Sequence, residues 1–175
     1  MKRYFTTTAA GLVLMTVACY GQTTLKEIKI GTVLYVSLPD YMSRTIGLND
    51  AAVFQYKSTL KDVYGFIIDD NKEELKLAEL NFTSINEFYE AFITGFLQGI
   101  EKKNISNPLV QKKGNLNFLE ADVTYFDKEA GIDIYYLVGI VETGSSFYKV
   151  LSWAAVENKD KFKADFQKIL YSLKN

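Results

Sequence analysis

Four strand-like segments joined by short turns dominate the C-terminal part of the chain. Each is rich in β-branched and aromatic residues and is bounded by polar residues or glycine, as strands usually are. The turns are too short to carry a crossover between parallel strands, so neighbouring segments must run antiparallel. The segments are Val110–Lys113, Leu116–Asp127, Ile132–Glu142 and Phe147–Val156. This antiparallel meander constrains the fold more than any other feature of the sequence.

The hydrophobic pattern differs between two of these segments. Apolar and polar side chains alternate cleanly from Leu119 to Tyr125. That alternation predicts a solvent-facing side that carries Glu120, Asp122 and Thr124. In Ile134–Val141 both faces are apolar, as in strands that are covered on both sides. This segment is therefore expected at the centre of the sheet.

Three further extended stretches lie nearer the N-terminus. The first, Glu27–Pro39, is interrupted by a glycine and ends at a proline, which has no N–H to donate to a sheet ladder. The others are Ala52–Lys57 and Val63–Ile68. The polar run Asp69–Asn71 is expected to end the last of them. The sheet should therefore draw strands from both halves of the chain.

Three segments have the periodicity of helices. Lys72–Leu80 is short and charged, whereas the second helix begins at Ser84, with Glu87 completing a capping box. The third, Lys159–Leu173, has one apolar face and Asn158 as its N-cap. Small residues beside the apolar stripe of the second helix predict close packing against a neighbouring element; they are Ala91, Gly95 and Gly99. Helices packed on the faces of a mainly antiparallel sheet make an α+β fold.

The first 21 residues have the features of a secretory signal peptide. Two basic residues precede the apolar run Ala9–Ala18, which is too short to span a bilayer. Two ways of processing the signal peptide remain open: cleavage before Gln22, or lipidation of Cys19 in a bacterial lipoprotein. Residues 22–175 then form one domain, which is periplasmic or secreted and touches the membrane only through a lipid at Cys19.

The absence of two residue types excludes several chemistries. Histidine is absent and Cys19 is the only cysteine, which excludes Ser–His–Asp and Cys–His catalysis and zinc sites built from these residues. Without Lys2 and Arg3 the 20 basic residues become 18, against 21 acidic residues, so the chain offers no field that would attract nucleic acid. The acidic run that starts at Asp69 lacks the glycine and the terminal glutamate of a calcium-binding EF-hand loop. The sequence predicts no catalytic residue, cofactor or metal.

Arg44 is the only arginine left once the export segment is removed. Only its guanidinium could form a two-pronged contact with a carboxylate or a phosphate. Two interpretations stay open: a surface ion pair with Asp40 or Asp50, or an anion-binding residue. Arg44 is therefore the one candidate ligand residue in the chain.

The order of elements resembles the PsbP/DcrB-like superfamily of small exported α/β sandwich proteins. The resemblance covers nearly the whole mature chain and is carried by Val36–Pro39, by Tyr135 and Tyr136, and by Phe147–Ser172. It implies a PsbP-like sandwich. Members include an extrinsic subunit of the photosynthetic oxygen-evolving complex and a periplasmic lipoprotein linked to phage uptake. The superfamily has no shared catalytic residues, and its members generally bind or scaffold other molecules.

The sequence therefore favours an exported, non-enzymatic binding or scaffolding protein of the bacterial cell envelope. Its partner would be an unknown envelope protein or a small ligand. The alternatives are a small-ligand or metal-binding module and an enzyme that uses carboxylates or a tyrosine. An enzyme should bring two carboxylates together in a concave site with shifted pKa values. A scaffold should instead expose an apolar or aromatic patch.

Overall fold

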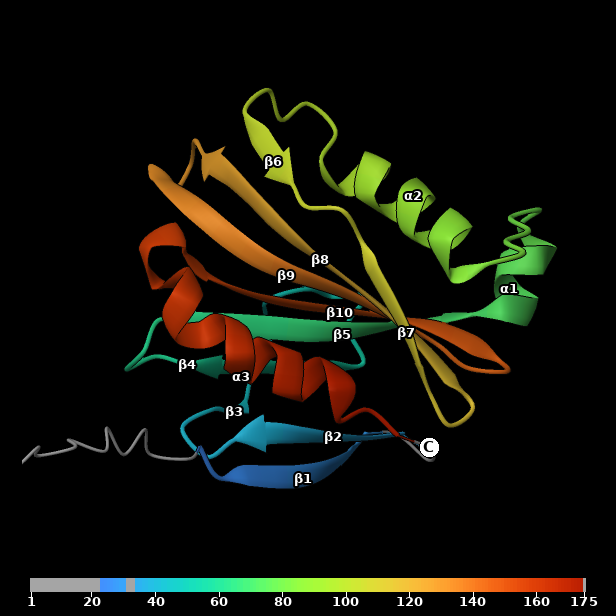
Figure 1. Cartoon of the computed structure of the whole chain (residues 1–175), viewed down its shortest axis with the longest axis horizontal. Helices are drawn as coiled ribbons and strands as arrows, with labels where there is room; N and C mark the ends of the chain where they lie inside the picture. Colours follow the sequence, from blue (N-terminus) through green and yellow to red (C-terminus); the bar gives the residue numbers. More distant parts are fainter. Residues whose placement is uncertain (1–22, 31–33, 175) are drawn as a thin grey trace, which may run out of the picture.

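The computed structural model describes residues 23–30 and 34–174. One large antiparallel sheet has the strand order β3-β4-β5-β10-β9-β8-β6, and β7 also pairs with β8. Figure 1 shows this sheet nearly edge-on, with α2 above it and α3 and the β1–β2 hairpin below. Its strands are β3 (Ser43–Arg44), β4 (Phe54–Ser58), β5 (Val63–Asn71), β6 (Lys103–Ile105), β7 (Leu109–Lys113), β8 (Leu116–Asp127), β9 (Ile132–Glu142) and β10 (Ser146–Ala155). The helices are α1 (Lys72–Leu77), α2 (Ile85–Phe96) and α3 (Lys159–Tyr171), and a 3-10 turn covers Val156–Asn158.

The predicted α+β class and the C-terminal meander are confirmed. Strands β8, β9 and β10 begin and end within one residue of the expected segments, and each pairs antiparallel with the next. Strand β9 lies between β8 and β10 and is buried over most of its length, as its two apolar faces predicted. The strand β6 was not predicted, since its three residues are polar or exposed.

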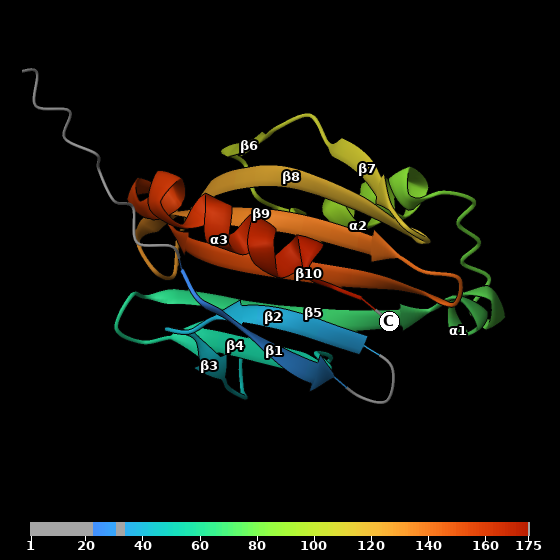
Figure 2. The ribbon, with the colours of Figure 1, turned by 60° about the horizontal axis from the view of Figure 1, so that its bottom comes forward.

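One face of the sheet is covered by α3 and by a separate hairpin, which Figure 2 shows in front of the large sheet. The extended stretch Glu27–Pro39 is not one strand; it forms β1 (Leu25–Ile30) and β2 (Leu34–Pro39), which pair antiparallel. β2 ends at its proline as predicted. Helix α3 lies so close to β9 that a Cβ at Gly139 would overlap the side chain of Leu170. The side chains buried between these layers include Val36, Phe54, Tyr56, Tyr135, Leu137, Phe162 and Phe166.

The opposite face is covered by α2. The Ser84 hydroxyl accepts a hydrogen bond from the backbone N–H of Glu87 at 3.2 Å, as the capping box predicted. The Glu87 carboxylate accepts from the backbone N–H of Thr83 rather than from that of Ser84. The ring of Phe88 stacks on Phe147 of β10 with centroids 4.3 Å apart. This second core joins α2 to Leu119, Ala121, Val123, Val138 and Ile140.

Two predictions about polar residues are wrong. The run Asp69–Asn71 does not end β5, because these residues pair with the start of β10, and Asn71 then caps α1. The polar side of β8 does not face water, because α3 crosses it. Glu120 is buried and accepts a hydrogen bond from Gln167, and Lys163 bonds Asp122. Neither the pairing of β5 with a strand 75 residues away nor the position of α3 follows from local pattern.

The small residues of α2 do not pack against a neighbour. Ala91, Gly95 and Gly99 are all exposed, and a Cβ at either glycine would meet no atom within 4 Å. Gly99 instead has a positive φ of 77°, just beyond the end of the helix, a conformation that favours glycine. At the start of α3, Asn158 precedes the helix as predicted, but its side chain makes no capping hydrogen bond.

Gly65 and Gly95 provide a matched test of this packing. A Cβ at Gly65 would overlap the buried ring of Tyr56, whose hydroxyl lies 2.6 Å from that of Ser152. We expect Gly65→Ala to lower the free energy of unfolding by ~1–3 kcal/mol, the usual range for overpacking. Gly95→Ala should raise it by up to ~1 kcal/mol, because alanine favours a helix where space is open. Urea unfolding measures both; an unchanged Gly65→Ala variant would contradict the packing described.

Candidate functional site: an aromatic ladder on the sheet

Four aromatic residues from four neighbouring strands lie on the face of the sheet that α2 partly covers. They are Tyr64 of β5, Trp153 of β10, Tyr136 of β9 and Tyr125 of β8. Trp153 pairs directly with both Tyr64 and Tyr136, so their side chains share one face. Tyr125 lies two residues along β8 from the partner of Tyr136. We call these four residues the aromatic ladder.

The rings of the ladder stack on one another in a continuous row. The centroid distances are 5.5 Å from Tyr64 to Trp153, 5.4 Å from Trp153 to Tyr136 and 5.8 Å from Tyr136 to Tyr125. The corresponding interplanar angles are 22°, 26° and 9°. Phe66 meets Trp153 edge-on at 5.7 Å, and Phe96 of α2 meets Tyr136 edge-on at 5.4 Å. The two inner rings of the row, Trp153 and Tyr136, are thus also contacted from the side.

The ladder remains partly exposed because α2 covers only part of this face. The helix packs on β8 and β9 and ends at Phe96, so all four ladder residues keep part of their surface in solvent. The polar ends of the rings are engaged as well. The Tyr64 hydroxyl donates to Asp62 at 2.7 Å. Burial raises the pKa of Tyr136, and a hydrogen bond with Tyr125 and the charge of Asp127 raise it further.

Hollows lie at both ends of α2. One of about 460 Å³ lies between residues 99–102, which follow the helix, and residues 125–129 at the end of β8. Tyr125 lines this hollow and also a neighbouring one of about 350 Å³. A third, of about 300 Å³, lies beside Lys72, Phe82 and Phe147. The first hollow is therefore continuous with one end of the ladder.

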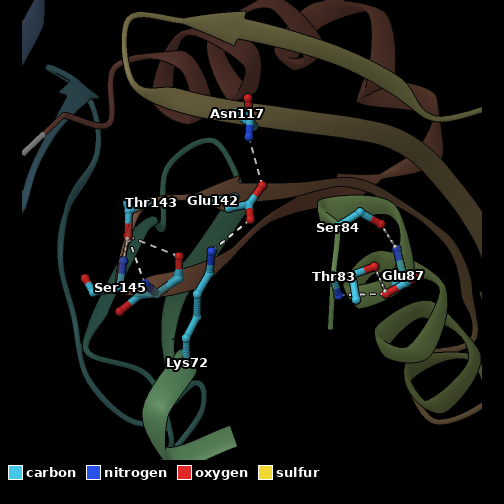
Figure 3. Close-up of polar contacts among 9 residues, drawn as sticks. Lys72, Thr83, Ser84, Glu87, Asn117, Glu142, Thr143 and Ser145 are labelled. Carbon is cyan, nitrogen blue, oxygen red and sulfur yellow. Dashed lines mark hydrogen bonds and ion pairs between the residues drawn. The ribbon is translucent and has the colours of Figure 1, made fainter. Parts of the chain in front are cut away.

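The third hollow is bordered by a polar network that holds α1 on the sheet (Figure 3). Lys72 donates to Glu142 at 2.8 Å, and Asn117 donates to the other oxygen of the same carboxylate at 2.9 Å. The Lys72 ammonium also lies 4.5 Å from the centroid of the Phe147 ring. Both oxygens of Glu142 are thus occupied by donors from β8 and α1, which is the arrangement of a structural ion pair.

The buried carboxylates lie on the opposite face, under α3. Burial acts to raise the pKa of Asp122, but hydrogen bonds from Lys163, Lys159 and Tyr135 outweigh it and lower that pKa. Asp165 accepts from Tyr41 at 2.7 Å and from Lys168 at 2.8 Å. Neither carboxylate lines any of the three hollows. Within residues 23–30 and 34–174, no group of three or more carboxylates is placed to hold a metal ion.

Comparison with solved structures identifies the architecture. No protein-family model and no curated protein matches the sequence. The solution structure of cyanobacterial PsbP (CyanoP) from Synechocystis matches 92% of this chain and 98% of its own, with a TM-score of 0.59 and 16% identity. The protein has a PsbP-like fold.

Two further structures share this PsbP-like fold. LpqN of Mycobacterium tuberculosis, described as involved in cell envelope biogenesis, has a TM-score of 0.57 at 12% identity over 91% of this chain and 96% of its own. The Ran-binding protein Mog1p of Saccharomyces cerevisiae has a TM-score of 0.59 at 8% identity over 87% of this chain and 96% of its own. At these identities the likeness is one of fold.

In this PsbP-like fold, Arg44 lies on β3 and is exposed. Its guanidinium is 5.7 Å from the centroid of the Phe54 ring, and in the described part of the chain it forms no ion pair with Asp40 or Asp50. A role in anion binding stays a hypothesis. Cys19 lies outside the described residues.

Sequence reasoning did not find the aromatic ladder, although the pairing of two of its residues could have been predicted. The β9–β10 turn pairs Phe147 with Glu142, and counting outward from that pair aligns Trp153 with Tyr136. Tyr64 comes from a strand that is distant in sequence, so its place beside Trp153 had no local signal. The number of aromatic residues alone did not separate core rings from exposed ones.

The ion pairs of Asp122 predict how stability depends on pH. Because the folded state lowers its pKa, the stability that its lysine contacts contribute is present above the unfolded value of about 3.9 and is lost as the pH falls through the folded value. We expect Asp122→Asn to be less stable than wild type at neutral pH, and the difference to shrink in acid. Urea unfolding over a pH series measures it; a difference that stays constant would contradict this account.

Proposed function

We propose that this chain is an exported, non-enzymatic binding or scaffolding protein of the bacterial cell envelope, and that it binds a protein partner through the aromatic ladder. The observation that carries the proposal is a row of four partly exposed rings, including Trp153, fixed across four strands. Tryptophan and tyrosine are enriched among the residues that dominate binding energy at protein interfaces. Rings that already pack on one another also lose little conformational entropy on binding.

The orientation of the rings favours a protein over a sugar. Stacking turns the faces of the inner rings toward one another across the strands, so their edges point outward. Sugars bind to exposed ring faces, whereas protein interfaces use the apolar edge and the polar tip of aromatic side chains together. Lys149 and Asp70, paired at 2.9 Å on the neighbouring strands β10 and β5, add a charged border.

The beginning of the described domain lies on the face opposite the ladder. The Thr23 hydroxyl donates to Asp165 of α3 at 3.3 Å, and the Thr24 carbonyl accepts from the backbone N–H of Asp40. Because the described residues begin on the α3 side, attachment through a segment before Thr23 is compatible with an accessible ladder. No helix among the described residues combines the length and apolar character needed to cross a bilayer.

The fold comparisons support the same role by analogy. LpqN is described as involved in cell envelope biogenesis, and Mog1p as a Ran-binding protein. Both use a comparable α+β sandwich, although fold alone does not fix function. The carboxylate or tyrosine enzyme has less support, because Asp122 and Asp165 are ion-paired beneath α3 rather than placed in a hollow.

Recovery of an envelope protein by the purified domain starting at Gln22 tests the proposal. We expect Trp153→Ala to weaken binding to the recovered partner about 30-fold, the effect of losing ~2 kcal/mol at a central interface residue. Leu77→Ser is the matched control, because Leu77 is exposed on α1, which follows the end of β5 opposite to Tyr64.

Circular dichroism establishes that both variants are folded, and titration by surface plasmon resonance gives the affinities. Equal affinity of wild type and Trp153→Ala would exclude the ladder as the binding surface. Loss of binding in Leu77→Ser alone would move the interface to α1.

A further inference from the structure

One border of the large sheet is an open strand edge. In the described part of the chain β6 and β7 pair only with β8, and every residue from 101 to 115 is exposed. Figure 2 shows these two strands beyond β8, on the side of the sheet away from β3. We propose that β7 pairs with an extended, acidic segment of another protein, which adds one strand to the sheet. The site is independent of the aromatic ladder, which lies on a face of the sheet rather than along this border.

The backbone of β7 selects an extended strand as the occupant. Lys113 pairs with Leu116 across a two-residue turn, and the first turn residue, Gly114, has a positive φ of 59°. The residues that flank such a turn form a hydrogen-bonded pair, and hydrogen-bonded pairs alternate along an antiparallel ladder. The N–H and C=O groups of Val110 and Lys112 therefore point away from β8, where an added strand can pair with both residues.

The charges along this border favour an acidic strand. Residues 101–115 carry one acid, Glu101, and four lysines that form no ion pair among the described residues. The lysines are Lys102, Lys103, Lys112 and Lys113. The same charges oppose pairing with a second copy of β7, because that pairing would bring the lysines of both copies together. Charge complementarity therefore points to an acidic partner rather than to a dimer of this chain.

The side chains of β7 define the pattern of the partner segment. Leu109 and Val110 are exposed apolar residues at one end of the strand, whereas Lys112 and Lys113 lie at the other. In antiparallel pairing, side chains directly opposite one another lie on the same face and interact. A matching segment therefore has acids at its first two positions, a polar residue opposite Gln111, and apolar residues at its last two positions.

The other open edges of the fold fit this segment less well. β3 has only two residues, which is too short to hold an added strand. β1 pairs only with β2, but Glu27 lies between its two lysines, Lys26 and Lys29, and would repel an acidic strand. Among these edges, β7 alone combines open backbone groups with neighbouring lysines and no acid within the strand.

Titration of the purified domain with the peptide acetyl-Glu-Glu-Thr-Val-Val-amide, followed by NMR, tests the pairing. We expect saturable shifts of the Val110 and Lys112 amides, and weaker binding as added salt screens the charges. The reversed peptide, acetyl-Val-Val-Thr-Glu-Glu-amide, has the same composition but places its acids opposite apolar residues, so it should bind about tenfold more weakly. Equal binding of the two peptides would overturn the proposal, as would the absence of saturable shifts at these two amides.

N-methylated peptides separate strand pairing from charge attraction alone. Methyl groups on the nitrogens of the second and fourth peptide residues should abolish saturable binding, because these N–H groups face Lys112 and Val110 and donate to β7. Methyl groups on the third and fifth residues should preserve binding, because those N–H groups point away from β7. Equal affinity of the two methylated peptides would contradict strand addition.

Two matched double variants locate the peptide on the fold. Lys112→Glu with Lys113→Glu should weaken binding about tenfold, because repulsion replaces attraction. Lys26→Glu with Lys29→Glu makes the same change of charge on β1 and should bind as wild type does. The reverse pattern would place the peptide on β1 and contradict the assignment. Because the methylated peptides are compared on the wild-type protein, that comparison remains decisive if a variant does not fold.

Discussion

The antiparallel register between β9 and β10 is the constraint on which the rest of the structure depends. A tight turn fixes it, because the Thr143 hydroxyl accepts hydrogen bonds from the backbone N–H groups of Ser145 and Ser146 at 3.2 and 2.9 Å. A slip of one residue would move every side chain of a strand to the opposite face. Both cores meet on β9, and the ladder needs Tyr136 beside Trp153, so one turn determines the cores and the candidate site together.

The two faces of the sheet differ in how completely they are covered. On the α3 side, polar groups are paired beneath a helix that packs so closely that a Cβ at Gly139 would overlap the end of the Leu170 side chain. On the α2 side, a shorter helix covers β8 and β9 and leaves aromatic side chains in contact with solvent. The chain enters the domain on the closed side, through Thr23 and Asp165. The first described residue is therefore held on the face opposite the aromatic ladder.

Local pattern was sufficient for much of the fold and for little of the candidate site. The boundaries of β8, β9 and β10 follow from alternation and turn residues, which act over a few positions. The extension of β5 to Asn71 and the covering of Glu120 depend on partners far away in sequence, so alternation alone gave the wrong environment. Arg44 was singled out as the only arginine after the export segment, whereas the aromatic ladder combines three of the 12 tyrosines with the only tryptophan, Trp153.

The central claim is that the ladder face, and not the hairpin face, meets the partner of this protein. Incorporation of a photo-crosslinking phenylalanine analogue in living cells tests it most directly, at Phe66 beside Trp153 and at Tyr35 on the opposite hairpin. Both side chains are partly exposed, so both can react. We predict a discrete protein adduct from position 66 and none from position 35. An adduct from position 35 alone, or equal adducts from both, would contradict the account.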